Sequence, residues 1–226
     1  MKNFELTNET IVNDCGVTLH RIKAVKNIIT PRFTVKAGEL GGFVEKVDNL
    51  ADDAWVSDNA CVYGNALVGG NARIYDDAEV SDNVKVSDNV MVCGNARVYD
   101  NAMVCGSTLI GGNAWVYGNA RVGGKAWVYG NAWVYGNAWV GCNALVGGNA
   151  DVFRTNHYLV IGPIGSRDDY TTFFRSNKGT IEVKCGCFMG TTDEFLAKVE
   201  KTHGDSKYAK VYRMATEMAL AQIDMN

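Results

Sequence analysis

The residues best suited to hold a charged ligand lie in the glycine-rich stretch GPIGSR, residues 162–167. Gly165 leaves backbone N–H groups accessible, Ser166 contributes a hydroxyl, and Arg167 contributes a guanidinium. These are the groups that bind a phosphate or a carboxylate. A glycine-rich turn with one arginine is also a common structural turn, so the sequence leaves both interpretations open.

Four further residues complete the predicted ligand site. Thr172 and His203 are expected near the anionic group, and Tyr158 or Tyr170 is expected to stack on a base. His203 lies between two predicted helices, so a second interpretation is that it closes the first helix favourably for the helix dipole.

A metal site is the other chemistry to consider in this part of the chain. Cys185, Cys187 and His203 would supply three zinc ligands, and no fourth ligand is evident. Buried thiols in a strand and turn explain the two cysteines better, with a redox role as a further alternative. We therefore predict no metal, no cofactor and no catalytic residue.

A six-residue repeat must position these groups, because it fills the centre of the chain. From Val44 to Val152 every sixth residue is Val, Ile or Leu, over nineteen consecutive positions. A small residue, most often Ala, stands two positions earlier, so both point to the same face of a short strand. Asn or Asp precedes the small residue. Because Asn tolerates the left-handed backbone region, we expect it to form a corner with the Gly or Asp before it.

This pattern resembles the hexapeptide-repeat left-handed parallel β-helix, in which three hexapeptides make one triangular turn of the chain. The resemblance covers about half the chain and implies a mainly β triangular solenoid of about six turns, roughly 30 Å long. The left-handed coiling is taken from that family. The string VKAGELGGFVE, residues 35–45, also resembles the opening of β-helical proteins encoded by bacteriophages and prophages.

Three regions follow from where the repeat begins and ends. Residues 1–43 are predicted to be an N-terminal β cap, because a solenoid end exposes unpaired backbone. Residues 44–153 form the β-helix. Residues 154–226 form a small α+β unit in the order β-β-β-α-α, with a hairpin, a first helix capped by Thr191 and Glu194, and a second helix.

The outer surface of the predicted prism carries aromatic residues, and all five tryptophans, Trp55 included, occupy the same outward position of the repeat. Such an apolar surface usually marks a partner interface. We predict a homo-oligomer, and the family resemblance suggests a trimer; a stacking platform for a sugar or base is the alternative. The predicted surface comprises Tyr99, Trp115, Tyr117, Trp133, Tyr135, Trp139 and Phe153.

Composition narrows the partners and the compartment. A net charge of −3 gives no general basic surface for nucleic acid. The sequence has no continuous apolar stretch of membrane-spanning length and no signal-peptide core, so no membrane partner is predicted. The seven cysteines have no disulfide-framework spacing, which favours a cytoplasmic location, the host cytoplasm if the protein is phage-encoded.

Histidine is too scarce for the enzymes that share this fold. Hexapeptide acyltransferases generally use a histidine base and the trimeric carbonic anhydrases use three histidine ligands, whereas this chain has only His20, His157 and His203. We therefore favour a non-enzymatic oligomer that captures a small phosphorylated ligand. If the phage resemblance holds, that ligand is a nucleotide immune messenger and the protein an anti-defence sponge. The alternatives are an acyl- or nucleotidyltransferase with His203 or His157 as base, and a structural or host-protein-docking module.

Overall fold

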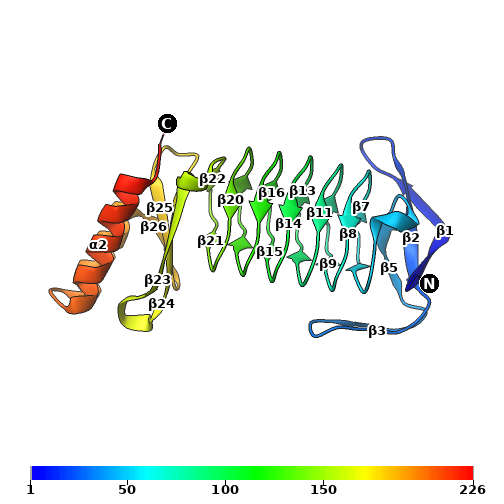
Figure 1. The fold of residues 1–226 in the computed structure, drawn as a ribbon, viewed down its shortest axis with the longest axis horizontal. Helices are drawn as coiled ribbons and strands as arrows, with labels where there is room; N and C mark the ends of the chain where they lie inside the picture. Colours follow the sequence, from blue (N-terminus) through cyan, green and yellow to red (C-terminus); the bar gives the residue numbers. More distant parts are fainter. Residues whose placement is uncertain (1, 226) are drawn as a thin grey trace.

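The computed structural model describes residues 2–225 as a central solenoid closed at both ends by other structure (Figure 1). The elements outside the repeat are β1 (Phe4–Val12), β2 (Thr18–Ala24), β3 (Ile28–Ile29), β4 (Thr34–Val35), β5 (Leu40–Val44), η1 (Val47–Asn49), η2 (Thr155–His157), β23 (Tyr158–Ile164), η3 (Gly165–Arg167), β24 (Asp169–Arg175), β25 (Ile181–Cys185), β26 (Phe188–Thr191), α1 (Thr192–His203) and α2 (Lys207–Gln222).

The repeat itself forms two-residue strands that stack into three parallel sheets, which are the walls of the solenoid. The first wall carries most of the outward-facing aromatic residues and is called the aromatic wall. It contains β7 (Cys61–Val62), β10 (Glu79–Val80), β13 (Arg97–Val98), β16 (Trp115–Val116), β19 (Trp133–Val134) and β22 (Asp151–Val152). The second wall contains β8 (Leu67–Val68), β11 (Lys85–Val86), β14 (Met103–Val104), β17 (Arg121–Val122) and β20 (Trp139–Val140). The third wall contains β6 (Trp55–Val56), β9 (Arg73–Ile74), β12 (Met91–Val92), β15 (Leu109–Ile110), β18 (Trp127–Val128) and β21 (Leu145–Val146). The predicted parallel solenoid of about six turns is confirmed.

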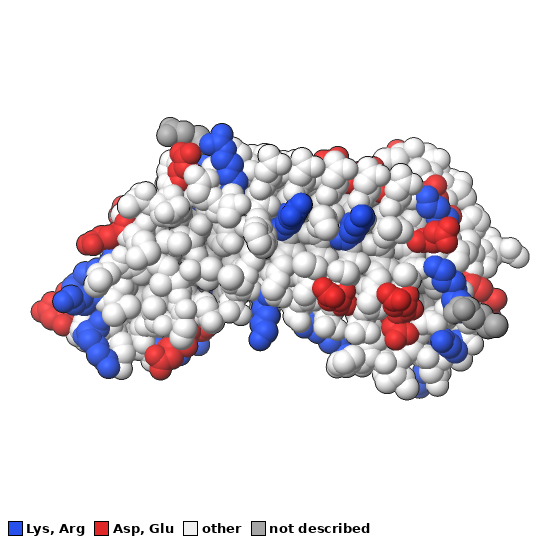
Figure 2. Space-filling view, in the orientation of Figure 1, with Lys and Arg blue, Asp and Glu red and all other residues white. Residues whose placement is uncertain are grey.

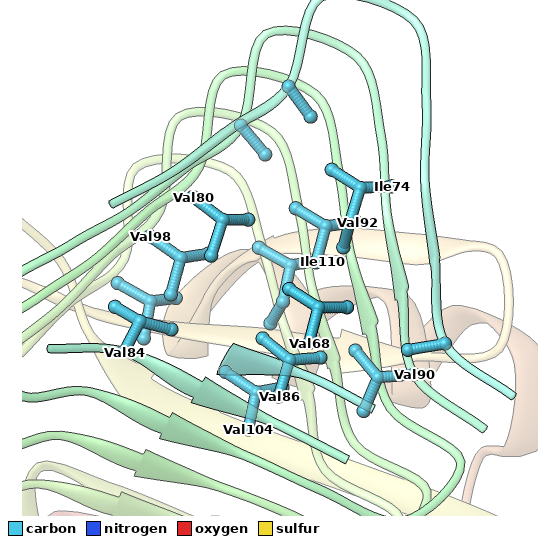
Figure 3. Packing of buried hydrophobic residues seen from close by; sticks show 14 of the residues in the cluster. Val68, Ile74, Val80, Val84, Val86, Val90, Val92, Val98, Val104 and Ile110 are labelled. Carbon is cyan, nitrogen blue, oxygen red and sulfur yellow. The ribbon is translucent and has the colours of Figure 1, made fainter. Parts of the chain in front are cut away.

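The aliphatic residue of each repeat points into the prism. Figure 3 shows three rows of these side chains, among them Val80 with Val98, Val92 with Ile110, and Val86 with Val104. The small residues two positions earlier are fully buried beside them. Since interiors are close-packed, one large and one small side chain per strand fill the narrow prism.

The corners differ from the prediction in which residue adopts the left-handed backbone. That residue is the Gly or Asp, such as Gly64 or Asp88, and not the Asn that follows. The Asn side chains instead bond to one another along the solenoid: Asn95 Nδ2 donates to Asn113 Oδ1 over 3.1 Å, and Asn113 donates on to Asn131. The Asn side chain therefore links successive turns by hydrogen bonds, and the Asn backbone does not adopt the left-handed conformation.

The N-terminal strands extend the aromatic wall. Strand β2 pairs antiparallel with β1 and β5, and β5 pairs parallel with β7. Phe33 and Val35, from the short β3–β4 hairpin between β2 and β5, pack in the solenoid core. Trp55, predicted to face outward, is only 1% exposed, because this N-terminal segment folds over it.

The C-terminal region closes the other end with a four-stranded antiparallel sheet, β23-β24-β25-β26. The predicted order β-β-β-α-α was wrong by one strand, since β26 precedes the helices. Phe174 packs into the solenoid core, whereas its neighbour Phe173 packs against the core formed with the helices. The sheet therefore lies between the last solenoid turn and α1 and α2 (Figure 1). The predicted cap of α1, Thr191 with Glu194, is confirmed, and the Ser206 side chain caps α2.

Charged side chains of both signs are interspersed on the face drawn in Figure 2, with uncharged surface between them over the solenoid. Within residues 2–225, no helix is long and apolar enough to cross a membrane.

Candidate functional site

A cavity of about 200 Å³ lies in the C-terminal cap, between η3, the β25–β26 turn and the two helices. It brings together three of the predicted ligand-binding residues: Ser166, Arg167 and His203. Its other lining residues are Cys185, Cys187, Phe188, Phe195, Lys198, Val199, Thr202 and Tyr212.

The cavity is lined by cationic side chains without acidic ones. Arg167 and Lys198 are exposed at its rim, and His203 is half-buried at the end of α1. None of the lining residues is Asp or Glu. The Arg167 guanidinium lies across Gly186, where a side chain would crowd it: a Cβ built there would come within 3.2 Å of Arg167 Cζ. Two cations beside a hydroxyl favour an anionic ligand.

Tyr212 forms the inner end of the cavity. Burial, reinforced by the neighbouring Cys185 thiol, raises the pKa of Tyr212, while hydrogen bonding to Ser166 opposes that rise. The His203 ring lies 5.7 Å from the Tyr212 ring, centroid to centroid. The phenol therefore stays protonated and can donate a hydrogen bond toward the cavity.

The backbone conformation and the close packing at position 165 both require a glycine. It adopts φ +75°, and a Cβ placed on it would collide with the Tyr212 hydroxyl. The glycine thus lets η3 approach α2 closely enough to bring Ser166 to the cavity.

Tyr158 and Thr172 lie away from the cavity, contrary to the prediction. Tyr158 Oη accepts a hydrogen bond from Gly141 N at 3.1 Å, and Thr172 Oγ1 accepts one from Leu145 N at 3.0 Å. No further solenoid turn follows to accept hydrogen bonds from these two backbone N–H groups. The side-chain oxygens of Tyr158 and Thr172 accept them instead. Tyr170 is also not among the lining residues; it lies two residues before Thr172 in β24, on the same face of the strand, and its ring lies beside Gly162.

The sequence analysis did not identify Lys198 as a site residue, because Lys198 belongs to no recognisable sequence motif. It lies on α1 between Phe195 and Thr202, which also line the cavity. The signal available was the helical spacing of three and four residues that places Phe195, Lys198 and Thr202 on one face.

The two cysteines also reach the cavity. Cys185 Sγ accepts a hydrogen bond from Thr171 Oγ1 at 3.3 Å, and Cys187 is exposed. In the described part of the chain, residues 2–225, no group of three or more His, Cys, Asp or Glu residues is arranged to hold a metal.

His157, one of the two histidines considered as a base, is inaccessible to substrate. Its side chain is fully buried, with its ring edge-on to Phe153 at 4.1 Å. Neither ring nitrogen has a hydrogen-bond partner among the described residues. Burial, with Arg175 and Arg154 nearby, lowers the pKa of His157.

This burial predicts an acid-sensitive stability. The pKa of His157 is 6.5 when unperturbed and lower in the folded protein, so below 6.5 the unfolded chain binds the extra proton. We expect the free energy of unfolding to fall as the pH drops from 7.5 to 5.5, by up to about 1.4 kcal/mol per pH unit. Urea unfolding across this range measures it. His157→Phe should flatten the dependence; an unchanged slope in that variant would assign the effect to other groups.

The aromatic wall carries a continuous ladder of rings. Tyr99, Tyr117 and Tyr135 stack with centroids 4.9 Å apart, and Trp115 stacks on Trp133 at 5.7 Å. Trp133 and, on the second wall, Trp139 are exposed, while Phe153 is half-buried at the end of the ladder. That these rings mediate oligomerisation stays a prediction.

Three stretches of the repeat, residues 96–112, 114–130 and 126–141, match the family model described as the YdcK beta solenoid repeat. The chain is a β-solenoid repeat protein. The matched stretches lie within the walls and do not reach the C-terminal cavity, so the similarity concerns the architecture of the β-solenoid. No curated protein matches the chain.

Proposed function

We propose that this β-solenoid protein binds, without catalysis, a small anionic molecule in its C-terminal cavity, with a phosphorylated compound as the natural ligand. The observation that carries the proposal is the convergence of Arg167, Lys198 and His203 on one cavity with no acidic lining residue. Charge-assisted hydrogen bonds from such groups are about twice as strong as neutral ones.

The size of the cavity limits the ligand. At about 200 Å³ it is smaller than the roughly 300–1,000 Å³ of typical ligand pockets. A phosphate with a few attached atoms fits this volume, and the rest of a larger ligand would lie outside on the rim. A nucleotide immune messenger sequestered by a phage-encoded sponge, as the resemblance of residues 35–45 suggests, would insert one phosphate and leave its bases outside.

The side-chain arrangement supports binding over group transfer. A catalytic nucleophile needs a base within hydrogen-bond reach. Cys185 is hydrogen-bonded to Thr171 and to the Tyr212 hydroxyl, and the ring contacts of His203 are with Tyr208 and Tyr212. The transferase alternative would require His203 to turn away from these rings.

Loss of Arg167 or Lys198 tests the assignment. We expect Arg167→Ala and Lys198→Ala each to weaken binding of inorganic phosphate or AMP about 10- to 100-fold, since a hydrogen bond to a charged group contributes about 1.5–3 kcal/mol. Isothermal titration calorimetry measures the affinity. Lys201→Ala is the matched control, because Lys201 is an exposed lysine of the same helix that does not line the cavity. Equal affinities in all three variants would refute the site.

A further inference from the structure

Helix α2 has apolar side chains on two faces, and only one of these faces packs into the C-terminal cap. Tyr212 and Ala219 are buried on the inner face. On the outer face, Val211, Met214 and Met218 are 36%, 57% and 57% exposed. These three residues follow the alternating spacing of three and four that forms the contact seam between paired helices. The outer face of α2 therefore has the pattern of a helix-packing surface, and we call these three residues the seam.

The seam borders an apolar groove of about 170 Å³ between α2 and β23. Ile161 and Ile164 of β23 line it together with the seam and the buried Ala215, and none of its lining residues is polar or charged. Strand β23 is the edge strand of its sheet, and Pro163 leaves it without one N–H donor, so a further strand would pair poorly with it. The groove and the seam thus offer side-chain packing, which a helix can use without pairing its backbone.

Two exposed charged residues flank the seam. Lys210 precedes Met214 by four residues and Glu217 follows it by three. Because seven residues make about two helical turns, both charges lie on the same side of α2. In the part of the chain that the structure describes, neither takes part in an ion pair, whereas the neighbouring Arg213 is paired with Glu200 of α1. Lys210 and Glu217 are therefore available to a molecule that docks on the seam.

The seam and its two flanking charges are complementary to themselves. Suppose that a second copy of α2 lies antiparallel on the first, with a two-fold axis beside Met214. In this register Lys210 meets Glu217 of the second copy, and by symmetry Glu217 meets Lys210 of the second copy. The same register places Val211 against Met218 of the second copy. Apolar side chains and opposite charges therefore match at the same time, and each helix N-terminus lies toward the C-terminus of the other helix, which is favourable for the helix dipoles.

We propose that two copies of this protein dimerise through α2 and the groove beside it, as an antiparallel pair of helices about a two-fold axis. Such an interface is closed, because both copies use the same surface. It joins the two molecules at their C-terminal ends, where α2 lies on the outer side of the sheet (Figure 1). The dimer does not use the aromatic wall, and it is independent of anion binding in the C-terminal cavity.

An acidic residue in the seam tests the proposal. We expect the full-length protein to be a dimer at micromolar concentration. Met214→Asp should weaken the dimer at least about 30-fold, because the carboxylates of the two copies meet at the axis. Leu220→Asp is the matched control, since Leu220 is 54% exposed on α2 but lies two residues after Met218, on a different side of the helix. It should leave the dimer unchanged, and sedimentation equilibrium measures both dissociation constants.

Charge reversal tests the antiparallel register. Lys210→Glu and Glu217→Lys should each weaken the dimer about 5- to 30-fold, because each substitution replaces two attractions between the copies by two repulsions. The double variant Lys210→Glu with Glu217→Lys restores opposite charges at both contacts. It should dimerise about as tightly as the unmodified protein, an outcome that general damage to α2 would not give.

Four results would overturn the proposal. The first is a protein that stays monomeric at submillimolar concentration. The second is equal weakening by Met214→Asp and Leu220→Asp. The third is an oligomer that Trp133→Ala dissociates and Met214→Asp does not, which would assign assembly to the aromatic wall. The fourth is a double charge variant that dimerises as weakly as the single variants, which would exclude the antiparallel register.

Discussion

Val122→Asp should unfold the solenoid, whereas Arg121→Asp, one residue earlier in strand β17, should leave it folded. Val122 is 1% exposed, inside the prism, between Val104 of the preceding turn and Val140 of the following one. Arg121 points outward and is exposed. The two variants therefore place the same carboxylate on opposite faces of one strand.

The physical reason is the cost of an unpaired charge in a dry interior. Burial of an ionised carboxylate without a partner is one of the few changes that destabilise a protein by more than about 4–5 kcal/mol. A surface substitution usually changes stability by about 0.5 kcal/mol or less. Circular dichroism during thermal unfolding measures both variants. A folded Val122→Asp with an unchanged Tm would contradict the assignment of the aliphatic row to the interior.

Gly165→Ala should lower the free energy of unfolding and the phosphate affinity of the protein more than Gly179→Ala does. Both glycines have a positive φ, +75° and +72° respectively, so both variants carry the backbone cost of about 1–2 kcal/mol. Only at Gly165 would the added methyl group collide with Tyr212; at Gly179 nothing lies within 4 Å. The difference between the variants therefore isolates the contact between η3 and α2.

The steric term adds about 1–3 kcal/mol, typical of overpacking, so Gly165→Ala should lose about 2–5 kcal/mol in total. Because η3 carries Ser166 and Arg167, the variant should also bind phosphate more weakly, while Gly179→Ala binds it normally. Urea unfolding and calorimetric titration measure the two effects. Equal stability and equal affinity in both variants would show that η3 and α2 do not need this close approach.

The solenoid walls could be predicted because their register is set by covalent spacing. With every sixth residue aliphatic and three strands to a turn, residues 18 apart must stack, as Val104, Val122 and Val140 do. The sequence contains this information locally and repeats it nineteen times. The corner residue was assigned to the Asn and not to the Gly or Asp because both types tolerate the left-handed region, and only the bonds between turns distinguish them.

The ends of the solenoid could be predicted less well, because their contacts join distant segments. Trp55 has the same local pattern as the exposed Trp139, yet it is buried because the N-terminal segment folds over the first turn. Strand β26 is only four residues long and contains Gly190, so it has no alternating pattern to reveal it. Its partner β25 supplies the missing hydrogen bonds only in the folded chain.

The sequence by itself determined the parallel solenoid, its three walls and the cap of the first helix, and it predicted the glycine-rich turn as a ligand-binding segment. Tertiary structure alone decided which of the predicted ligand-binding groups meet. In the sheet, the alternation of side chains directs Phe173 toward the helices and Thr172 toward the solenoid, so Thr172 and Tyr158 close the last turn. Packing of α1 against α2 brings Lys198 and His203 to Arg167, across more than thirty residues of sequence. A cavity depends on which faces of separate elements are turned together, and no local spacing encodes that.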